Sequence, residues 1–159
     1  MSKKILIAYF SYTEHTREIA KKIQAVTGGD LFEIRPAKAY SDDYDIAERQ
    51  ARKEAKDGFL PDLAEIPDNL ADYDTIFIGT PNWFNKVAPP VATFLADNDF
   101  TGKTIAPFCT HGGDGATRVS ADLGKYRGGS HLIECLDLYE DGGRDADGKI
   151  REWLNRNGF

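Results

Sequence analysis

Cysteine is scarce in this sequence. The 159 residues include only Cys109 and Cys135, which end two different apolar runs and have no CxxC spacing. We therefore expect buried free thiols rather than a disulfide or a redox pair. No set of His, Cys and carboxylates has the spacing of a metal site, and no Ser-His-Asp or Cys-His nucleophile set can be assembled. The sequence thus indicates neither a metal centre nor a catalytic residue.

Long apolar runs and clustered basic residues are missing as well. No run approaches the ~18 residues of a membrane span, and the N-terminus lacks the apolar stretch and cleavage site of a signal peptide. The 20 Lys and Arg residues are outnumbered by 26 Asp and Glu, which gives a formal net charge of −6. This balance argues against a nucleic-acid surface and against docking on anionic lipid. We expect a cytoplasmic protein whose acidic surface faces a basic partner.

Short apolar runs alternate with amphipathic segments along the chain. The runs cover residues 5–10, 31–34, 75–79, 104–109 and 132–136, and are typical of buried parallel strands. Helical spacing covers residues 13–27, 87–97, 114–126 and 145–157, and another helix is expected within residues 40–57. This pattern predicts one α/β domain over residues 1–159, built on a doubly wound, five-stranded parallel sheet. Residues 57–74, with six carboxylates and no Lys or Arg, predict an irregular acidic connection.

The first apolar run ends at a cluster of hydroxyl residues and is followed by a helical segment. A strand that leads into a helix N-terminus leaves backbone N–H groups unpaired, and the helix dipole favours an anion there. The hydroxyls of Ser11, Thr13 and Thr16 lie at this junction. We therefore predict a phosphate-binding loop over residues 11–16.

The loops after the third and fourth apolar runs are unusual in composition. Trp83 and Phe84 are adjacent aromatics that follow the turn residues Pro81 and Asn82, which favours ligand stacking over burial in the core. Residues 112–115 include three glycines, which allow the backbone to approach a ligand closely. Ligands of doubly wound sheets bind beyond the carboxyl ends of the strands, so these loops and the first loop should meet. A flat ring with a phosphate is the implied ligand.

With these motifs the chain resembles the flavodoxin family over essentially its whole length. The matching motifs are Ser11-Tyr12-Thr13-x-x-Thr16, Thr80-Pro81-Asn82-Trp83-Phe84 and Thr110-x-Gly112-Gly113. The resemblance implies a flavodoxin-like three-layer α/β/α sandwich with strand order 2-1-3-4-5, FMN as cofactor, and single-electron transfer. The cofactor-binding residues that it implies are Ser11, Tyr12, Thr13, Glu14, His15 and Thr16, then Thr80, Pro81, Asn82, Trp83, Phe84 and Asn85, then Thr110, His111, Gly112 and Gly113.

Some residues depart from the family pattern. Glu14 stands where the phosphate loop usually has glycine, beside His15 in place of asparagine. Glu14 either leaves phosphate binding intact or forms a capping box with Ser11 that competes with phosphate. Asn85 replaces a glycine often found near the flavin, although asparagine tolerates a positive φ. The third loop, residues 110–115, has no tyrosine to stack on the outer flavin face, so one face could be open.

Other conspicuous residues have simpler explanations. Asp114 is expected to cap the helix that follows it. The acidic run over residues 140–147 is expected to be solvated surface, with a possible part in docking, and Trp153 is expected in the core because it has helical spacing from Ile150.

Three functions remain open from the sequence. The first is a low-potential electron carrier that binds FMN and docks on a reductase and an acceptor through an acidic face. The second is an FMN-dependent NAD(P)H or quinone oxidoreductase that uses the open flavin face. The third is a flavodoxin-like binding module that has lost its cofactor. The presence of Glu14 in the first loop suggests this third function. The oligomeric state stays open.

Overall fold

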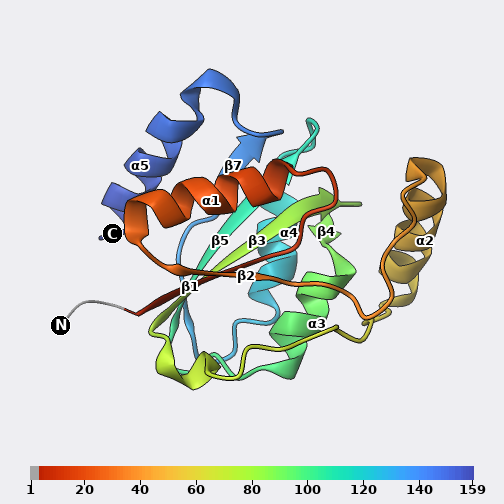
Figure 1. The fold of residues 1–159 in the computed structure, drawn as a ribbon, viewed down its shortest axis with the longest axis horizontal. Helices are drawn as coiled ribbons and strands as arrows, with labels where there is room; N and C mark the ends of the chain where they lie inside the picture. The colour runs from red at the N-terminus through yellow and green to blue at the C-terminus, as the bar shows by residue number, and fades with distance from the viewer. Residues whose placement is uncertain (1–3) are drawn as a thin grey trace.

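The computed structural model describes residues 4–159 and has a central parallel sheet with helices on both faces (Figure 1). The strands of this sheet are β1 (Ile5–Tyr9), β2 (Asp30–Glu33), β3 (Thr75–Trp83), β5 (Thr104–His111), β6 (His131–Leu132) and β7 (Leu136–Tyr139). Their order is β2-β1-β3-β5, and both β6 and β7 pair with β5. Counted as one interrupted fifth strand, β6 and β7 complete the predicted order 2-1-3-4-5, which is confirmed.

The fifth strand is interrupted, whereas the sequence predicts a continuous run over residues 132–136. Ile105 pairs with Leu132 and Phe108 pairs with Leu136, so two residues of β5 face three residues of the edge strand. The extra residue forms a bulge and moves the longer paired segment to Leu136–Tyr139. Pro107, which has no N–H to donate, lies in the stretch of β5 opposite the bulge. The predicted bounds of this strand are therefore wrong.

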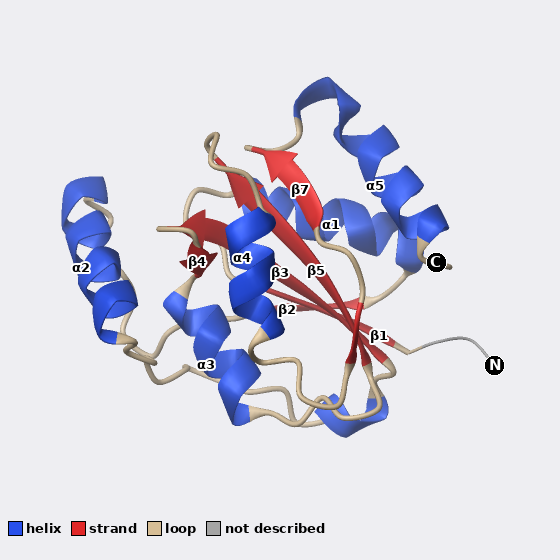
Figure 2. Cartoon of the chain, turned by 180° about the vertical axis from the view of Figure 1, so that it is seen from behind, coloured by secondary structure: helices blue, strands red, loops and turns tan. Residues whose placement is uncertain are grey.

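The helices form two outer layers. Helices α1 (His15–Thr27) and α5 (Ala146–Arg156) cover one face of the sheet, and α3 (Pro89–Asp97) and α4 (Thr117–Gly124) cover the other (Figure 2). Side chains of β3 alternate between the two cores, so that Phe77 packs with α5 while Ile76 and Ile78 face the opposite side. Trp153 is 1% exposed and packs edge to face on Phe77. The predicted three-layer sandwich and core position of Trp153 are confirmed.

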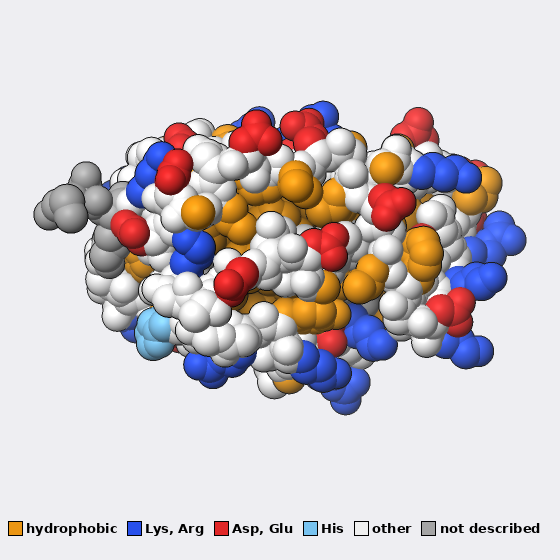
Figure 3. Space-filling model, turned by 90° about the horizontal axis from the view of Figure 1, so that it is seen from below, with side chains coloured by type: hydrophobic (Ala, Val, Ile, Leu, Met, Phe, Trp, Pro, Cys, Tyr) orange, Lys and Arg blue, Asp and Glu red, His pale blue; other side chains and the backbone are white. Residues whose placement is uncertain are grey.

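Helix α2 (Tyr44–Asp57) stands apart from these layers, at the right of Figure 1. It begins at Asp43, whose side chain accepts from the amides of Asp45 and Ile46. It buries only Ala47, Ala51 and Glu54. Exposed Lys and Arg side chains concentrate at this end of the molecule in Figure 3. The negative net charge is therefore not spread evenly over the surface.

A hairpin replaces the loop expected after the third apolar run. Strand β3 continues through Trp83 and pairs antiparallel with β4 (Lys86–Val87). Phe84 and Asn85 form the turn with φ of 59° and 64°, and two positive φ values are typical of the type I′ turn that joins tightly paired strands. Asn85 therefore adopts the positive φ that asparagine tolerates, as the sequence suggested. The hairpin holds Trp83 and Phe84 on a rigid support rather than on a flexible loop.

The long connections carry little regular structure. Between α2 and β3 there is a single 3-10 turn, η1 (Leu70–Asp72), and an isolated bridge between Pro36 and Leu63. A second 3-10 turn, η2 (Gly143–Asp145), precedes α5. The irregular acidic connection is confirmed. None of the helices in residues 4–159 has the length and apolarity needed to cross a membrane.

We predict that Gly79→Ala destabilises the fold. A Cβ at Gly79 would lie 2.3 Å from Cζ of Phe108, which is fully buried, so the ring and the strand must shift at a cost of about 1–3 kcal/mol. Gly148→Ala is the matched control, because its Cβ meets nothing within 4 Å and alanine favours the helix α5. Urea unfolding measures both variants. A Gly79→Ala variant as stable as Gly148→Ala would contradict this packing.

Candidate functional site

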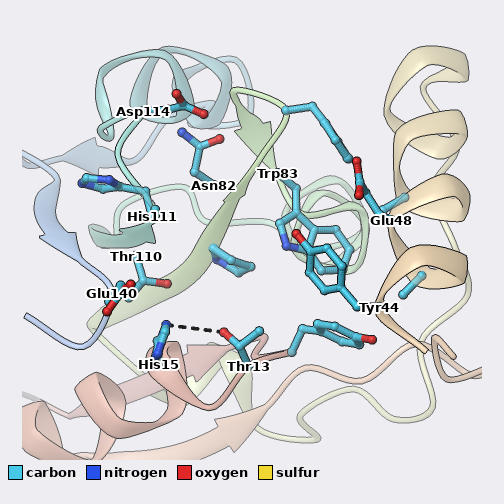
Figure 4. A pocket seen from close by; sticks show the side chains of 16 residues that line it. Thr13, His15, Tyr44, Glu48, Asn82, Trp83, Thr110, His111, Asp114 and Glu140 are labelled. Carbon is cyan, nitrogen blue, oxygen red and sulfur yellow. Dashed lines mark hydrogen bonds between the residues drawn. The ribbon is translucent and has the colours of Figure 1, made fainter. Parts of the chain in front are cut away.

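A pocket of about 360 Å³ opens at the carboxyl ends of β1, β3 and β5, where the sequence predicts that three loops meet (Figure 4). Helix α2 forms its remaining side. The lining residues are Tyr12, Thr13, His15, Tyr44, Ala47, Glu48, Ala51, Pro81, Asn82, Trp83, Phe84, Thr110, His111, Gly112, Asp114 and Glu140. All three loops thus contribute to one cavity.

The first loop presents a row of unpaired amides. The first backbone hydrogen bond of α1 runs from the amide of Glu18 to the carbonyl of Glu14, and the Arg17 amide donates to Ser11 Oγ at 3.2 Å. The amides of residues 12–16 have no acceptor within residues 4–159. Consecutive free amides at a helix N-terminus form an anion-binding nest, and the helix dipole adds to it.

Glu14 takes the left-handed conformation that glycine favours, with φ of 72°. Its carboxylate pairs with the Arg17 guanidinium instead of turning back to the Ser11 amide, so the capping-box interpretation is wrong. This hydrogen bond from Arg17 lowers the pKa of Glu14. Glu14 does not line the pocket. Its charge is directed to the outer surface, and only its backbone belongs to the nest.

Arg17 is held by a second carboxylate. Its guanidinium also donates to Glu33, which in turn pairs with Arg35. Burial alone would raise the pKa of Glu33, but the hydrogen bonds from the two arginines outweigh it and lower that pKa. Arg17 is therefore committed to structure, because its partners fix the first turn of α1 against β2.

The hydroxyls of the first loop have different partners. Thr16 Oγ1 lies 2.8 Å from Thr110 Oγ1 in a buried contact that joins the first loop to the third. Ser11 accepts the Arg17 amide, as described above. Neither Ser11 nor Thr16 lines the pocket. Thr13 and His15 do line it, with 3.5 Å between Thr13 Oγ1 and His15 Nδ1 (Figure 4). These two side chains are the ones available to an anion.

Trp83 forms a fixed aromatic wall. Its ring packs edge to face on Phe10, Tyr40 and Tyr12, with centroid separations of 5.3, 5.2 and 6.0 Å. Three rings thus hold the indole in place while it remains partly exposed at the pocket. Phe84, the next residue, has the Arg52 guanidinium 4.7 Å from its ring centroid.

Asn82 joins the second loop to the third. Its side-chain NH₂ donates to the Gly115 carbonyl at 2.7 Å, and its Oδ1 accepts the Asn85 amide at 2.8 Å. Thr80 is buried, and its hydroxyl accepts the Ala88 amide at 3.0 Å. Thr80 and Asn85 therefore support the hairpin from outside the pocket lining.

The third loop is held by a histidine and a carboxylate. His111 Nε2 lies against Asp137, and its Nδ1 accepts the Gly113 amide at 3.0 Å. The second oxygen of Asp137 accepts the Ala116 amide at the beginning of α4. Asp137 therefore supports this helix, and the prediction that Asp114 caps it is wrong, since α4 has no such contact. Asp114 is exposed and lines the pocket instead.

The two thiols take no part in this site. Cys109 is free and buried in the core, and burial raises its pKa to about 12. Cys135 is also free, with a pKa raised by burial. Within residues 4–159 no group of His, Cys and carboxylates could hold a metal ion.

Sequence reasoning missed one wall of the pocket. Residues 44, 47, 48 and 51 of α2 line it, a spacing of three and four that puts them on one helix face. Glu140 also lines it; the residue is exposed, as expected for the solvated surface and docking face predicted over residues 140–147, but its place at the pocket was not predicted. The Glu140 amide donates to the His111 carbonyl at 2.8 Å, which brings it against the third loop. The helical spacing in α2 was visible in the sequence, whereas the contact of Glu140 depends on the shifted strand β7.

Comparisons with known proteins agree with this architecture. The flavodoxin family model matches residues 4–157. A flavoprotein from Bacteroides eggerthii is 32% identical, with 97% of each chain covered and a TM-score of 0.85. A Lactobacillus acidophilus flavoprotein in complex with FMN is 22% identical over 95% of this chain and 98% of that one, with a TM-score of 0.77. A flavodoxin from Fusobacterium nucleatum bound to flavin mononucleotide is 13% identical over 98% and 96% of the chains, with a TM-score of 0.58.

We predict that Glu14→Gly raises the thermal unfolding temperature and that Glu14→Ala lowers it. Both variants lose the ion pair with Arg17, but only glycine relieves the left-handed backbone at φ 72°. The expected difference between the two variants is a few degrees, about 3–6 °C. Calorimetry of the flavin-free protein measures it. Equal melting temperatures would contradict the strained conformation at this position.

Proposed function

Because the chain belongs to the flavodoxin family, we propose that it binds FMN and carries electrons at low potential between protein partners. Bound FMN supplies the redox chemistry, while the protein supplies orientation and electrostatics. No side chain is required as an acid or a base. The residues fit the cofactor in three respects, namely an anion site, an aromatic wall and a glycine-containing loop, all on one pocket.

The row of free amides at residues 12–16 is the observation that carries the proposal. A phosphate accepts several charge-assisted hydrogen bonds, and a nest of backbone amides can donate them without the help of a positively charged side chain. Thr13 and His15 can donate further bonds from the pocket lining. Because the Glu14 carboxylate is paired with Arg17 on the outer side, it leaves the nest open.

The hairpin side of the pocket suits a flat ring. Trp83 provides an apolar surface that three neighbouring rings hold still. Gly112 is exposed and lines the pocket without a side chain that would fill it. The L. acidophilus and F. nucleatum proteins, which have similar folds, bind FMN in their structures. This similarity supports FMN as the cofactor of this chain.

The charge of the pocket favours a low reduction potential. The lining contains Glu48, Asp114 and Glu140 but no Lys or Arg. Because Glu48 is paired with Arg52, which lies outside the lining, the negative charge of the pocket comes from Asp114 and Glu140. Carboxylates near a flavin disfavour its negatively charged reduced form, since like charges repel in a region of reduced dielectric constant. The same carboxylates, of which Asp114 and Glu140 are exposed, suit a partner with a basic face. Association should weaken as salt rises, because exposed charges are screened.

An FMN-dependent NAD(P)H or quinone oxidoreductase is the second candidate. The specific observation in its favour is the third loop, where Gly112 and Gly113 are exposed and which contributes no phenol or indole ring to the pocket. The carboxylates of the lining count against an anionic nicotinamide nucleotide, because they repel its phosphates. They do not count against a neutral quinone.

Two measurements on the protein freed of flavin test the proposal. Titration of FMN should give saturable, one-to-one quenching of flavin fluorescence, since the ring would stack in the Trp83 pocket. Mixing the loaded protein with NADPH should leave the flavin oxidised until a partner reductase is added. Unchanged fluorescence at micromolar protein would favour a binding module without cofactor. Rapid reduction by NADPH alone would favour the oxidoreductase.

We predict that Asp114→Asn raises the reduction potential of the bound flavin. A carboxylate in the lining repels the negatively charged reduced flavin by an energy on the order of 1 kcal/mol, or about 40 mV for one electron. Solvent screening of this exposed side chain reduces the expected shift to about 10–40 mV. Asp68→Asn is the control, because Asp68 is exposed but lies outside the pocket lining. Equal potentials in the two variants would contradict control by the pocket carboxylates.

A further inference from the structure

One wall of the pocket comes from α2, although α2 is the helix least attached to the sheet layers. Tyr44, Ala47, Glu48 and Ala51 line the pocket from one face of this helix. The two alanines are buried, whereas the Tyr44 side chain is 62% exposed. Figure 4 shows Tyr44 extending from α2 into the pocket. The α2 face therefore consists of two small buried side chains, one carboxylate and one large ring at the N-terminal end of the helix.

Tyr44 has few partners among the rings of the pocket. Trp83 is packed against three other rings, and Phe84 lies beneath Arg52. Tyr44 contacts only Tyr12, with the rings tilted at 45° and their centroids 6.5 Å apart. Its hydroxyl has no hydrogen-bond partner in residues 4–159, so nothing fixes the end of the side chain. A large exposed ring with free faces gains stability when a flat apolar ligand covers it.

The third loop leaves room for such a contribution. No residue from His111 to Asp114 has a phenol or indole ring, and Gly112 and Gly113 have no side chain at all. Ala47 and Ala51 are too small to fill the space in front of Trp83, which keeps a slot open between the hairpin and α2. A flat ring in this slot would meet Trp83 from the hairpin and Tyr44 from the helix.

We infer that Tyr44 is the second aromatic wall of the flavin slot and that α2 tightens onto the ring through it. The inference rests on the proposed binding of FMN. The missing stacking residue of the third loop is thus replaced from the second crossover rather than lost.

The first loop and α2 are in direct contact, so that binding of an anion at the first loop is coupled to the position of Tyr44. The Tyr12 hydroxyl donates to the Ser41 carbonyl at 2.7 Å, just before α2 begins. Tyr12 also supplies one of the free amides of the nest and packs on both Tyr44 and Trp83. An anion that orders the first loop therefore also restricts the segment that carries Tyr44.

The other contacts of α2 leave room for a small shift of its N-terminal turn, which carries Tyr44. The helix is anchored near its C-terminal end, where the Tyr40 hydroxyl donates to Glu54 at 2.6 Å and Lys86 Nζ donates to the Ala55 carbonyl at 3.0 Å. At its N-terminal end, Tyr44 and Ile46 are both exposed. The C-terminal end of α2 is thus held by Tyr40 and Lys86, whereas the N-terminal end is attached through the first loop, so that a small shift of that loop would bring Tyr44 toward the slot.

Tyr44→Ala, Tyr44→Phe and Ile46→Ala test the inference by FMN titration of the flavin-free protein. Tyr44→Ala should weaken FMN binding about 10- to 100-fold and leave the bound flavin brighter, because stacking both stabilises and quenches it. Tyr44→Phe should bind like the wild type, since the ring remains and the hydroxyl has no partner to lose. Ile46→Ala is the matched control: it removes an exposed apolar side chain from the same turn of α2 but outside the pocket lining.

Hydrogen exchange of α2 gives a second readout that is independent of affinity. FMN should slow exchange over residues 44–51 in the wild type and in Tyr44→Phe, and slow it less in Tyr44→Ala at saturating FMN. If Tyr44→Ala binds FMN within about twofold of Ile46→Ala and shows equal protection, the inference is overturned while the proposed function stands. If the wild type itself binds no FMN, the proposed function fails first.

Discussion

Five consecutive backbone amides at the beginning of α1 have no acceptor within the described chain, and the surrounding structure maintains that state. The Arg17 amide, next in line, is already satisfied by Ser11. Arg17 itself draws the Glu14 carboxylate outward and is anchored by Glu33. The buried contact between Thr16 and Thr110 then ties this turn to the third loop. Thr13 and Glu14 are exposed, so water can satisfy these donors in the free protein, and the contacts keep the row open for the phosphate of the proposed cofactor.

The aromatic and charged parts of the pocket follow from elements that meet at the same edge of the sheet. The β3–β4 hairpin holds Trp83 still, and Asn82 connects it to the loop after β5. Asp137 and His111 hold that loop from β7. The lining carboxylates of Asp114 and Glu140 leave the pocket with negative charge, whereas the third lining carboxylate, Glu48, is paired with Arg52. Neutral amides can hold a phosphate in a pocket that also contains carboxylates, because the N–H groups and the helix dipole attract an anion without a positively charged side chain.

Much of this arrangement was predictable from the sequence, since it depends on local signals. Apolar runs located the strands, and hydroxyl residues before a helical segment pointed to the loop whose amides have no acceptor within the described chain. The orientation of the Glu14 side chain was not predictable from the sequence. Its carboxylate pairs with Arg17, which lies close to Glu14 only once the first turn of α1 has formed. The bulge opposite Pro107 moved the last strand and brought Glu140 to the pocket, which no periodicity indicates. Helix α2 was located correctly but its role was missed, because a polar surface helix gives no sign of which face borders a cavity.

The most direct test of the account is a paired titration of the flavin-free protein with FMN and with riboflavin, which share the ring but differ in the phosphate. If the amides of residues 12–16 hold that phosphate, FMN should bind at least about 100-fold more tightly, since each charge-assisted hydrogen bond contributes about 1.5–3 kcal/mol. Equal affinity for the two flavins would contradict the central claim, and would mean that the free amides at the beginning of α1 are not a phosphate site.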